Sequence, residues 1–232
     1  MKRFLFVSVL AVAAVAAATT TTVLRADADR LKDASVVLTE MAGAADNGIP
    51  QNLLGKAQCV VIIPGVKKAA LGVGGQYGRG YISCRTAAGW SAPGGIRIEG
   101  GSVGFQIGGS DTDVILLVLN ERGVNRLLSS QFTVGADAAV AAGPIGRQAS
   151  AQTDATMMAE ILAWSRSRGV FAGISLQGST LREDTGESKD LYGSEISNKE
   201  IVKGNHAVPP AAADLIRGLA LQKAGRAESA RS

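Results

Sequence analysis

The chain has 232 residues, which is enough for one domain of ordinary size with a sizeable core. Hydrophobic residues make up 46% of it but aromatic residues only 4%, so the apolar content is mostly Ala, Val, Leu and Ile. With 29 glycines and only 6 prolines, this composition excludes a disordered Pro/Gly-rich chain and predicts a fold with closely approaching strands. The net charge of +4 excludes strong whole-molecule attraction to nucleic acid or anionic lipid, so electrostatic binding requires a local patch.

The first residues have the pattern of an export signal. Lys2 and Arg3 precede an apolar run from Phe4 to Ala18, which is shorter than the ~20 residues that a transmembrane helix needs. We predict a signal peptide over residues 1–18, cleaved near residue 18, with a second candidate site near residue 28; the alternative is an uncleaved anchor. Cleavage reduces the 24 basic residues to 22 against 20 acidic ones. The predicted destination is the periplasm or cell envelope.

An amphipathic helix is predicted at the start of the mature chain, ending before Asn47-Gly48-Ile49-Pro50. Its apolar residues recur at steps of three and four, which places them on one stripe. The stripe consists of Leu24, Ala28, Leu31, Ala34, Leu38, Met41 and Ala45. Two interpretations remain open: the stripe packs on the domain core, or the helix inserts at a membrane interface.

Two cysteine-containing segments, QCVVII and RGYISC, are predicted to be strands, with a turn or bulge at Pro64-Gly65 after the first. Between them, glycines at positions 72, 74, 78 and 80 leave one strand face nearly bare, which permits close backbone approach or a sharp bend. In an oxidising compartment, Cys59 and Cys84 are a candidate disulfide if their strands pair antiparallel. Two separate buried thiols are the alternative.

The stretch from Trp90 to Asn120 is predicted to form the centre of the sheet. Apolar and polar residues alternate over 96–99 and 103–107, and Val114 to Leu119 is an unbroken apolar run typical of a strand buried on both faces. Glycine pairs at 100–101 and 108–109 separate these segments. We therefore predict a meander of three strands.

The rest of the chain is predicted to complete a single domain over residues 23–223, followed by a frayed tail at 224–232. Arg182 to Lys189 is charged and is predicted to be an exposed loop. The other expected elements are short helices at 120–129, 198–202 and 211–221, and strands within 132–142, 159–164 and 170–176. The fold class is α+β, with a curved, barrel-like antiparallel sheet and peripheral helices.

Catalytic and metal-binding motifs are absent from the sequence. The single histidine, His206, lies in a polar stretch, and no HExxH, GxSxG, P-loop or Cys/His zinc spacing occurs. Asp111 and Asp113 follow a Gly-Gly-Ser stretch, and we interpret them as residues of a turn and not as a catalytic or cation-binding pair. We predict no enzyme activity and no cofactor or metal, and a hydrolase without histidine support is the remaining alternative. No basic stripe interleaved with aromatic residues occurs, so no nucleic-acid partner is predicted.

Ordered blocks of the chain resemble the SYLF domain, a lipid-binding module. The resemblance covers roughly Ala34 to Leu221, nearly the whole mature chain. The blocks are KAQCVVIIPGVKKAALGVGGQYGRG, WSAPGGIRIEGGSVGFQIGG, VILLVLNERGVNRLL, TVGADAAVAAGPIGR and SRSRGVFAGISLQGSTL.

The resemblance implies a membrane-binding function. Eukaryotic members bind phosphoinositides through an amphipathic N-terminal helix and nearby basic residues, and yeast members bind actin filaments. Carried over by position, the candidate lipid-binding residues are Leu24, Arg30, Leu31, Lys32, Leu38, Lys67, Lys68 and Arg79. The expected function is non-enzymatic binding of a phosphoinositide-like or other anionic phospholipid, peripheral to the membrane. A periplasmic scaffold that binds another protein is the alternative.

Overall fold

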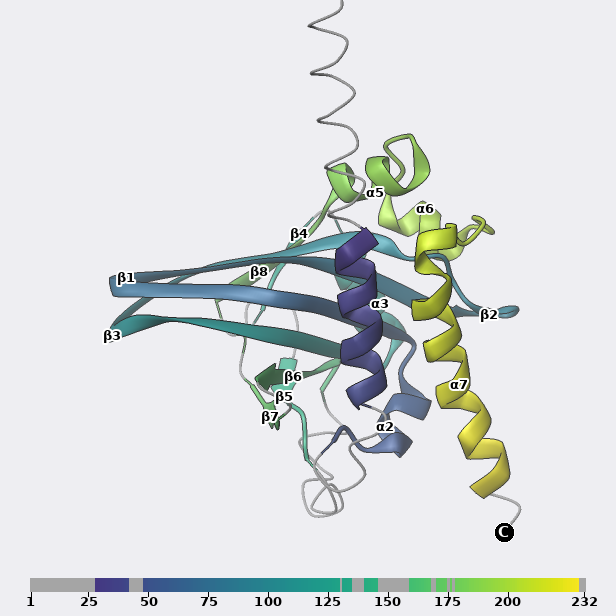
Figure 1. Cartoon of the computed structure of the whole chain (residues 1–232), viewed down its shortest axis with the longest axis horizontal. Helices are drawn as coiled ribbons and strands as arrows, with labels where there is room; N and C mark the ends of the chain where they lie inside the picture. Colours follow the sequence, from purple (N-terminus) through teal and green to yellow (C-terminus); the bar gives the residue numbers. More distant parts are fainter. Residues whose placement is uncertain are drawn as a thin grey trace, which may run out of the picture.

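Figure 1 shows a computed structural model of the chain. The structure describes residues 28–41, 48–129, 131–134, 140–145, 159–167, 170–174, 176 and 178–229, with the backbone alone described at 70–73, 102–109 and 223–229. The predicted signal peptide and Leu24 lie outside the described residues. A curled antiparallel sheet with several helices around it confirms the predicted α+β class.

Two very long strands form the centre of the sheet. Strand β1 (Cys59–Thr86) pairs antiparallel with strand β3 (Gly94–Val118), from Cys59 opposite Val118 to Ile82 opposite Gly94. Both strands double back at the left of Figure 1, so each contributes two halves. The predicted meander is therefore wrong. The glycine pairs at 100–101 and 108–109 stay paired with β1 instead of forming turns, because glycine tolerates a bent strand as readily as a turn.

The glycine-rich face of β1 lets the two halves of this strand approach each other closely, as the sequence predicted. A Cβ atom on Gly78 would lie 2.8 Å from Cγ2 of Val66, so only glycine fits here. The predicted bulge is present as well: the β1–β3 register shifts between Ile63 and Val66, and Gly65 has a φ of 61°.

We call the part of these strands that extends beyond the helices the blade, residues 66–77 of β1 and 99–112 of β3. Its end, residues 70–73 and 102–109, is the blade tip. In Figure 1 the blade projects to the left, and the helices and shorter strands lie towards the right.

Shorter strands extend the sheet beside β3. Strand β8 (Ser179–Glu183) pairs with residues 96–100 of β3, and β6 (Ile161–Ser167) pairs with residues 113–118. The other strands lie at the edges: β2 (Gly89–Trp90) on β1, β4 (Gln131–Thr133) on β8, and both β5 (Val140–Ala142) and β7 (Val170–Gly173) on β6. The β6–β7 pair confirms the predicted strands around a short connection.

Helices cover one face and one end of the sheet. The helix at 28–41, purple in Figure 1, lies beside α7 (Ala213–Ser229), where a Cβ on Gly218 would lie 2.9 Å from Leu38. The remaining helices are α2 (Gln51–Lys56), α3 (Glu121–Leu127), α5 (Thr185–Tyr192), α6 (Asn198–Lys203) and the 3₁₀ turn η2 (Pro210–Ala212). The expected exposed loop at 182–189 is wrong: these residues end β8 and begin α5, and Glu187 is fully buried.

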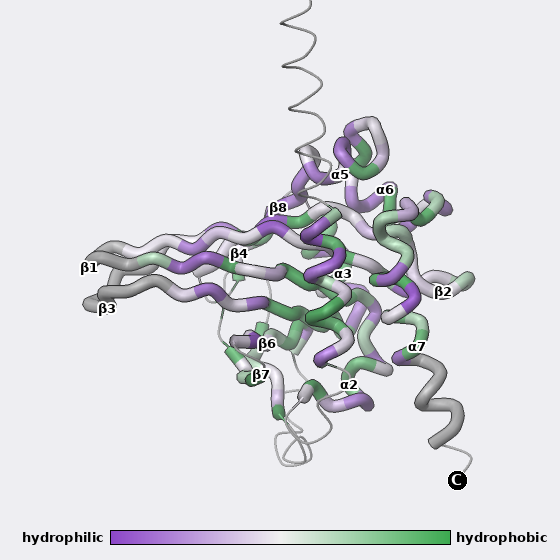
Figure 2. Tube along the Cα trace, in the orientation of Figure 1, coloured by the Kyte–Doolittle hydropathy of each residue, from purple (hydrophilic) through white to green (hydrophobic). Residues whose placement is uncertain are grey.

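The sheet has an apolar cluster on each face. One joins the sheet to the helices and includes Leu38, Ile62 and Trp164. The other lies between the doubled-back halves and includes Ile63, Ile98 and Val114. Figure 2 shows apolar segments where strands meet helices and more polar ones along the described part of the blade. The core therefore lies at the helical end, and the blade reaches away from it.

Candidate functional site

The N-terminal helix packs inward. Leu31 is 0% exposed and Leu38 is 1% exposed, and both belong to the apolar cluster between sheet and helices. Lys32 points to the exposed side of the same helix. Of the two interpretations of this stripe, the structure shows the packed one for residues 28–41. The candidate lipid contacts Leu31 and Leu38 are therefore core residues here.

Two further candidates, Arg30 and Arg79, meet at a largely buried group of charged and polar side chains. We call Arg30, Arg79, Tyr81, Asp184 and Glu187 the ion cluster. Arg79 donates to Asp184 from Nε at 2.6 Å and from Nη2 at 3.0 Å, and its Nη2 lies 3.3 Å from Oε2 of Glu187. Glu187 also accepts from Arg30 and from the Tyr81 hydroxyl. Both arginines thus have partners inside the protein.

The electrostatics of the ion cluster hold Arg79, Asp184 and Tyr81 each in one protonation state. The hydrogen bond to Asp184 raises the pKa of Arg79 above its usual range. Burial by itself would raise the pKa of Asp184, but the hydrogen bonds from Arg79 and from the Glu187 backbone lower it. Burial, and secondly the Glu187 charge, raises the pKa of Tyr81. At neutral pH Arg79 is therefore a cation, Asp184 a carboxylate and Tyr81 a neutral phenol.

The local sequence explains how α5 presents Glu187. Asp184 is the N-cap of this helix, and its side chain accepts from the Glu187 backbone N–H at 3.2 Å. Gly95 of β3 lets the helix approach, because a Cβ there would lie 2.6 Å from both Asp184 O and Glu187 Cβ. The Asp-x-x-Glu spacing from Asp184 to Glu187 is a helix-start signal that could have predicted α5 from the sequence. The ion cluster joins the N-terminal helix, β1 and α5.

Lys67 and Lys68 lie apart from the ion cluster, on the blade. The Lys67 side chain is 72% exposed and forms an ion pair with Asp111, whose side chain is 54% exposed. Lys68 is half-buried. The structure therefore separates these basic residues into Arg30 and Arg79, which meet in the ion cluster, and Lys67 and Lys68 on the blade, of which Lys67 is exposed and Lys68 half-buried.

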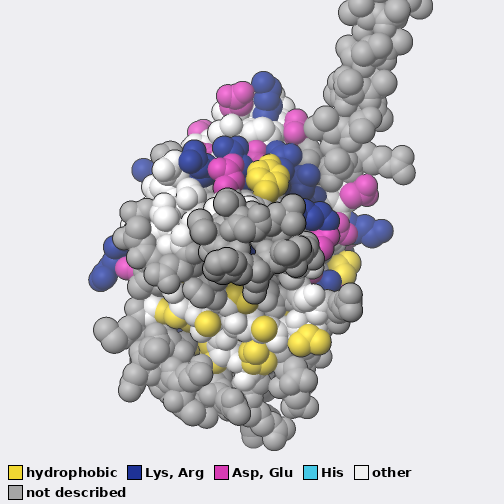
Figure 3. Space-filling view, turned by 90° about the vertical axis from the view of Figure 1, so that its left-hand side faces the viewer, with side chains coloured by type: hydrophobic (Ala, Val, Ile, Leu, Met, Phe, Trp, Pro, Cys, Tyr) yellow, Lys and Arg dark blue, Asp and Glu magenta, His cyan; other side chains and the backbone are white. Residues whose placement is uncertain are grey.

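Figure 3 looks at the molecule from the blade side. Lys, Arg, Asp and Glu side chains gather in a band in its upper half, and several apolar side chains lie in the lower half. Described charged residues near the blade include Glu99, which pairs with Arg97 at 2.7 Å and with Arg182 at 3.4 Å. This face is thus mixed in sign and partly apolar.

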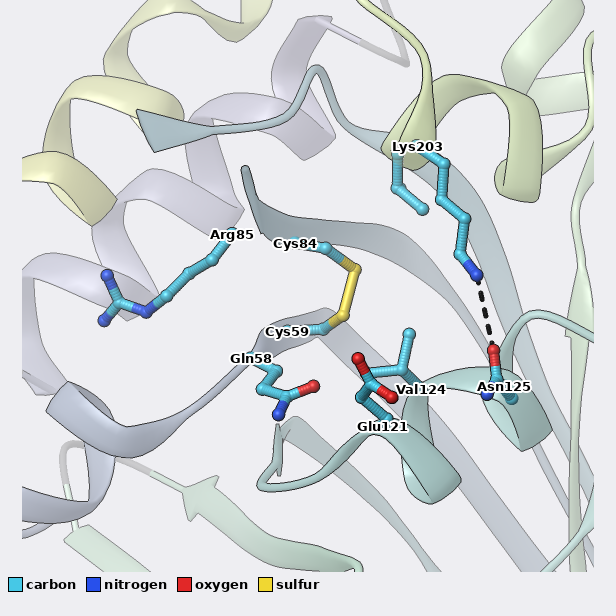
Figure 4. A pocket seen from close by; sticks show the side chains of 9 residues that line it. Gln58, Cys59, Cys84, Arg85, Glu121, Val124, Asn125 and Lys203 are labelled. Carbon is cyan, nitrogen blue, oxygen red and sulfur yellow. Dashed lines mark hydrogen bonds between the residues drawn. A yellow bond between two sulfur atoms is a disulfide. The ribbon is translucent and has the colours of Figure 1, made fainter. Parts of the chain in front are cut away.

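The cysteines are joined by a disulfide beside a pocket (Figure 4). They come from opposite ends of β1, brought together by its doubling back and not by pairing of two separate strands. The pocket has a volume of about 230 Å³ and is lined by Gln58, Cys59, Cys84, Arg85, Glu121, Val124, Asn125, Val202 and Lys203. Lys203 donates to Asn125 at 3.3 Å, and Arg85 donates to the carbonyl of Ala57 at 2.8 Å and stacks on Trp90. The two cations of the pocket are thus engaged with neighbouring groups.

Within the residues that the structure describes, no three His, Cys, Asp or Glu side chains gather as ligands for a metal ion. Asp111 and Asp113 lie on β3, not in a turn, and Asp113 pairs with Arg166 at 2.7 Å and accepts from Gly65 N at 2.9 Å. None of the described helices has both the length and the apolar content to cross a membrane.

Comparison with known proteins finds relatives among eukaryotes. The profile of the Ysc84 family, described as Las17-binding protein actin regulator, matches residues 99–222. Protein YSC84 of Saccharomyces cerevisiae is 35% identical over 189 residues, which cover 79% of this chain and 40% of the yeast protein. The SH3 domain-containing protein PJ696.02 of Schizosaccharomyces pombe is 36% identical over 179 residues, covering 75% and 41%.

A vertebrate protein is similarly close. The SH3 domain-containing YSC84-like protein 1 of Xenopus laevis is 35% identical over 173 residues, covering 73% of this chain and 51% of the frog protein. The chain spans about half or less of the length of these curated relatives.

Proposed function

This chain belongs to the Ysc84 family, which is built on the SYLF domain, and from that premise we propose that it is a non-enzymatic module that binds anionic phospholipid at a membrane surface. The observation that carries the proposal is the pair of lysines on the projecting blade. Lys67 and Lys68 are adjacent in sequence, and the blade can reach a flat surface before the helices do.

The energetics of these lysines suit reversible attachment. A lysine near an anionic bilayer contributes about 1 kcal/mol, and the contribution falls with salt. The exposed ion pair between Lys67 and Asp111 is worth at most about 1 kcal/mol, so a headgroup phosphate can compete for Lys67. Binding through two such residues is weak by itself and requires a further contribution from apolar contact.

The proposed location is the cell envelope. The apolar N-terminal run favours export, and the disulfide between Cys59 and Cys84 is typical of a protein that folds in an oxidising compartment. We take an anionic glycerophospholipid as the ligand there, and phosphoinositide specificity is not required.

Co-sedimentation with vesicles tests the proposal. The mature protein is mixed with vesicles of phosphatidylcholine alone and of phosphatidylcholine with an equal part of phosphatidylglycerol. We expect binding to the anionic vesicles that falls as salt rises, and K67E/K68E should reduce it by about tenfold or more. The matched control is K56E/K199E, which reverses two exposed lysines on α2 and α6. A folded wild-type protein that binds neither vesicle would exclude the proposal.

The second candidate is an envelope scaffold that binds another protein. Two observations favour it: the family is described by binding to Las17, and the blade side carries both charge signs. Protein surfaces of mixed sign select partners by complementarity. The same vesicle experiment separates the candidates, because a scaffold remains in the supernatant with both lipid compositions.

A further inference from the structure

We infer that a hollow beside α3 is a binding site for a phosphate-bearing anion, separate from the lysines of the blade. We call it the α3 hollow, and its volume is about 440 Å³. Its lining comes from α3, from β4 and from the connection between them, and consists of Arg122, Asn125, Arg126, Ser129, Gln131 and Phe132. Five of these six side chains can donate a hydrogen bond, and none of the six is acidic. This lining therefore suits an anionic ligand better than a cation or an apolar molecule.

The two arginines of the α3 hollow share one buried carboxylate. Arg122 and Arg126 are four positions apart on α3, so their side chains lie on the same face of the helix. Nε of Arg122 lies 3.7 Å from Oε1 of Glu160, and Nε of Arg126 lies 3.2 Å from Oε2. The Glu160 side chain is only 8% exposed, whereas those of Arg122 and Arg126 are 76% and 40% exposed. Two arginines against one glutamate give a formal net charge of +1, and the basic side of this group faces the solvent.

Arginine pairs of this kind match the geometry of a phosphate group. Two guanidinium groups carry far more N–H donors than one carboxylate can accept from, so most of these donors are available to water or to a ligand. In the part of the chain that the structure describes, Glu160 is the only acidic residue that pairs with Arg122 or Arg126. A phosphate accepts two parallel hydrogen bonds from the planar fork of an arginine, which a halide ion cannot do. We therefore expect phosphate to be preferred over chloride at equal ionic strength.

The end of α3 is capped where it meets the hollow. The carbonyl groups at a helix C-terminus carry partial negative charge and by themselves disfavour an anion. Here the Arg126 carbonyl accepts from the Ser129 backbone N–H at 3.1 Å and lies 2.6 Å from the Ser129 hydroxyl. The Val124 carbonyl accepts from the Leu128 N–H at 2.9 Å. These hydrogen bonds reduce the repulsion that the helix end would otherwise exert on a phosphate.

Two further basic residues flank the α3 hollow. Lys203 of α6 donates to Asn125, a lining residue, at 3.3 Å (Figure 4). Arg182 of β8, whose side chain is 40% exposed, lies directly opposite Gln131 in the β4–β8 register, and directly opposed residues share one face of the sheet. Glu121, the acidic residue at the start of α3, lines the pocket beside the disulfide instead. The basic surface thus continues beyond the hollow on two sides, which attracts an anion in a manner that weakens as salt rises.

Titration with inorganic phosphate, followed by NMR of the ¹⁵N-labelled mature protein, tests the inference. Phosphate should shift the amide resonances of α3 and β4, and sodium chloride at the same ionic strength should not. The decisive comparison is E160Q with R122Q/R126Q/E160Q, because the two variants differ only in the arginines and neither leaves a buried carboxylate without a partner. E160Q should bind phosphate at least as tightly as wild type, since Glu160 no longer competes for the arginines. The triple variant should bind it about tenfold or more weakly than E160Q.

Two further variants guard against effects on folding and on overall charge. R122Q changes only the more exposed arginine and keeps Arg126 on Glu160, and it should weaken phosphate binding by about threefold or more. R217Q/K189Q removes two exposed cations on α7 and α5, each of which has a single exposed acidic partner, and it should bind phosphate as wild type does. Thermal melting followed by circular dichroism checks that every variant is folded.

Co-sedimentation with equimolar phosphatidylcholine–phosphatidylglycerol vesicles identifies the source of the phosphate. Vesicle binding that is about tenfold weaker in R122Q/R126Q/E160Q than in E160Q would assign it to a lipid headgroup. Equal vesicle binding, with binding of inorganic phosphate lost, would assign it to a soluble phosphate compound. A wild type that binds phosphate but no vesicle would overturn the proposed function and leave this inference standing. A wild type without phosphate-specific shifts, or equal phosphate affinities of E160Q and the triple variant, would overturn this inference alone.

Discussion

Gly80 and Ile62, on opposite halves of the same strand, approach so closely that a Cβ atom on Gly80 would lie 2.1 Å from the Ile62 carbonyl oxygen. This contact is possible only because residue 80 has no side chain. It lies where β1 returns towards its own start, and the apolar cluster between the two halves begins beside it with Ile63 and Ile82. The doubled-back strand therefore depends on glycine at a specific position.

The first prediction follows from that contact. Gly80→Ala should lower the free energy of unfolding by about 1–3 kcal/mol, because backbone atoms of Ile62 cannot move aside as the end of a side chain can. Urea denaturation followed by circular dichroism measures it. The control is Gly75→Ala, whose Cβ would be 3.9 Å from the nearest atom outside its chain neighbours, and which should change stability by no more than about 0.5 kcal/mol. Equal stabilities of the two variants would contradict this account of the contact.

The second prediction concerns the carboxylate at the centre of the ion cluster. Glu187→Gln leaves the positive charges of Arg30 and Arg79 without their shared partner in a buried site, and it should cost about 3–5 kcal/mol of stability. The control is Glu195→Gln, in an exposed pair with Lys189 at 3.3 Å, where the loss should be less than about 1 kcal/mol. If E187Q unfolded at the same urea concentration as wild type, the ion cluster would contribute nothing to stability.

The sequence predicted the strands better than their connections. Alternation identified Ile96 and Ile98 as buried residues, and both are no more than 1% exposed. It could not decide whether the glycine pair at 100–101 turns the chain or bends a continuous strand, since glycine permits both. That decision depends on pairing with residues 75 and 76 of β1, which is a long-range contact.

The ion cluster was missed for a similar reason. A charged run such as 182–189 is normally solvated, and its burial here depends on Arg79, which is 105 residues away from Asp184. Arg79 is a lipid-binding candidate only by its position in the family resemblance, and its carboxylate partners are not visible in the local sequence. Leu31, Ala34, Leu38 and Met41 of the predicted helix stripe are all buried, because the period of the stripe is local, although the prediction did not include Val37, which is 2% exposed.

The third prediction addresses that stripe. Leu38→Ala should destabilise the domain by about 2–5 kcal/mol, because Leu38 is buried between the sheet and α7. Val36→Ala on the same helix, where Val36 is 44% exposed, should change stability by less than about 0.5 kcal/mol. Thermal melting measures both. A Leu38→Ala variant that melted with wild type but lost vesicle binding would instead indicate a helix that leaves the core at membranes.

The fourth prediction concerns the disulfide. Cys59 and Cys84 are 25 residues apart, and a loop of that size closed by a disulfide stabilises a domain by about 3 kcal/mol. Reductant should lower the urea midpoint of wild type and leave that of C59A/C84A unchanged. Thiol titration of the denatured, unreduced mature protein should find no free thiol. Two titratable thiols in that sample would show that the purified protein lacks the bond.

The last prediction concerns the pH dependence of the free energy of unfolding that arises from the Tyr81 phenol. Burial, and then the charge of Glu187, raises the pKa of Tyr81 above its ordinary value of 10.0. Above that pH the unfolded chain releases the phenol proton while the folded chain keeps it, so the unfolded state becomes relatively more favourable as pH rises. The contribution of Tyr81 to stability should therefore be complete below pH 10 and decrease above it by about 1.4 kcal/mol per pH unit.

Tyr81→Phe isolates this contribution, because Tyr192, whose pKa is also raised by burial, titrates in both proteins. The free energy of unfolding is measured in urea at several pH values on either side of 10. Below about pH 9 the two proteins should differ by a constant amount, the value of the hydrogen bond to Glu187. Above pH 10 the difference should shrink, because only wild type has the Tyr81 proton to lose in its unfolded state. A difference that stays constant through this range would mean that the Tyr81 phenol ionises equally easily in the folded and unfolded chains.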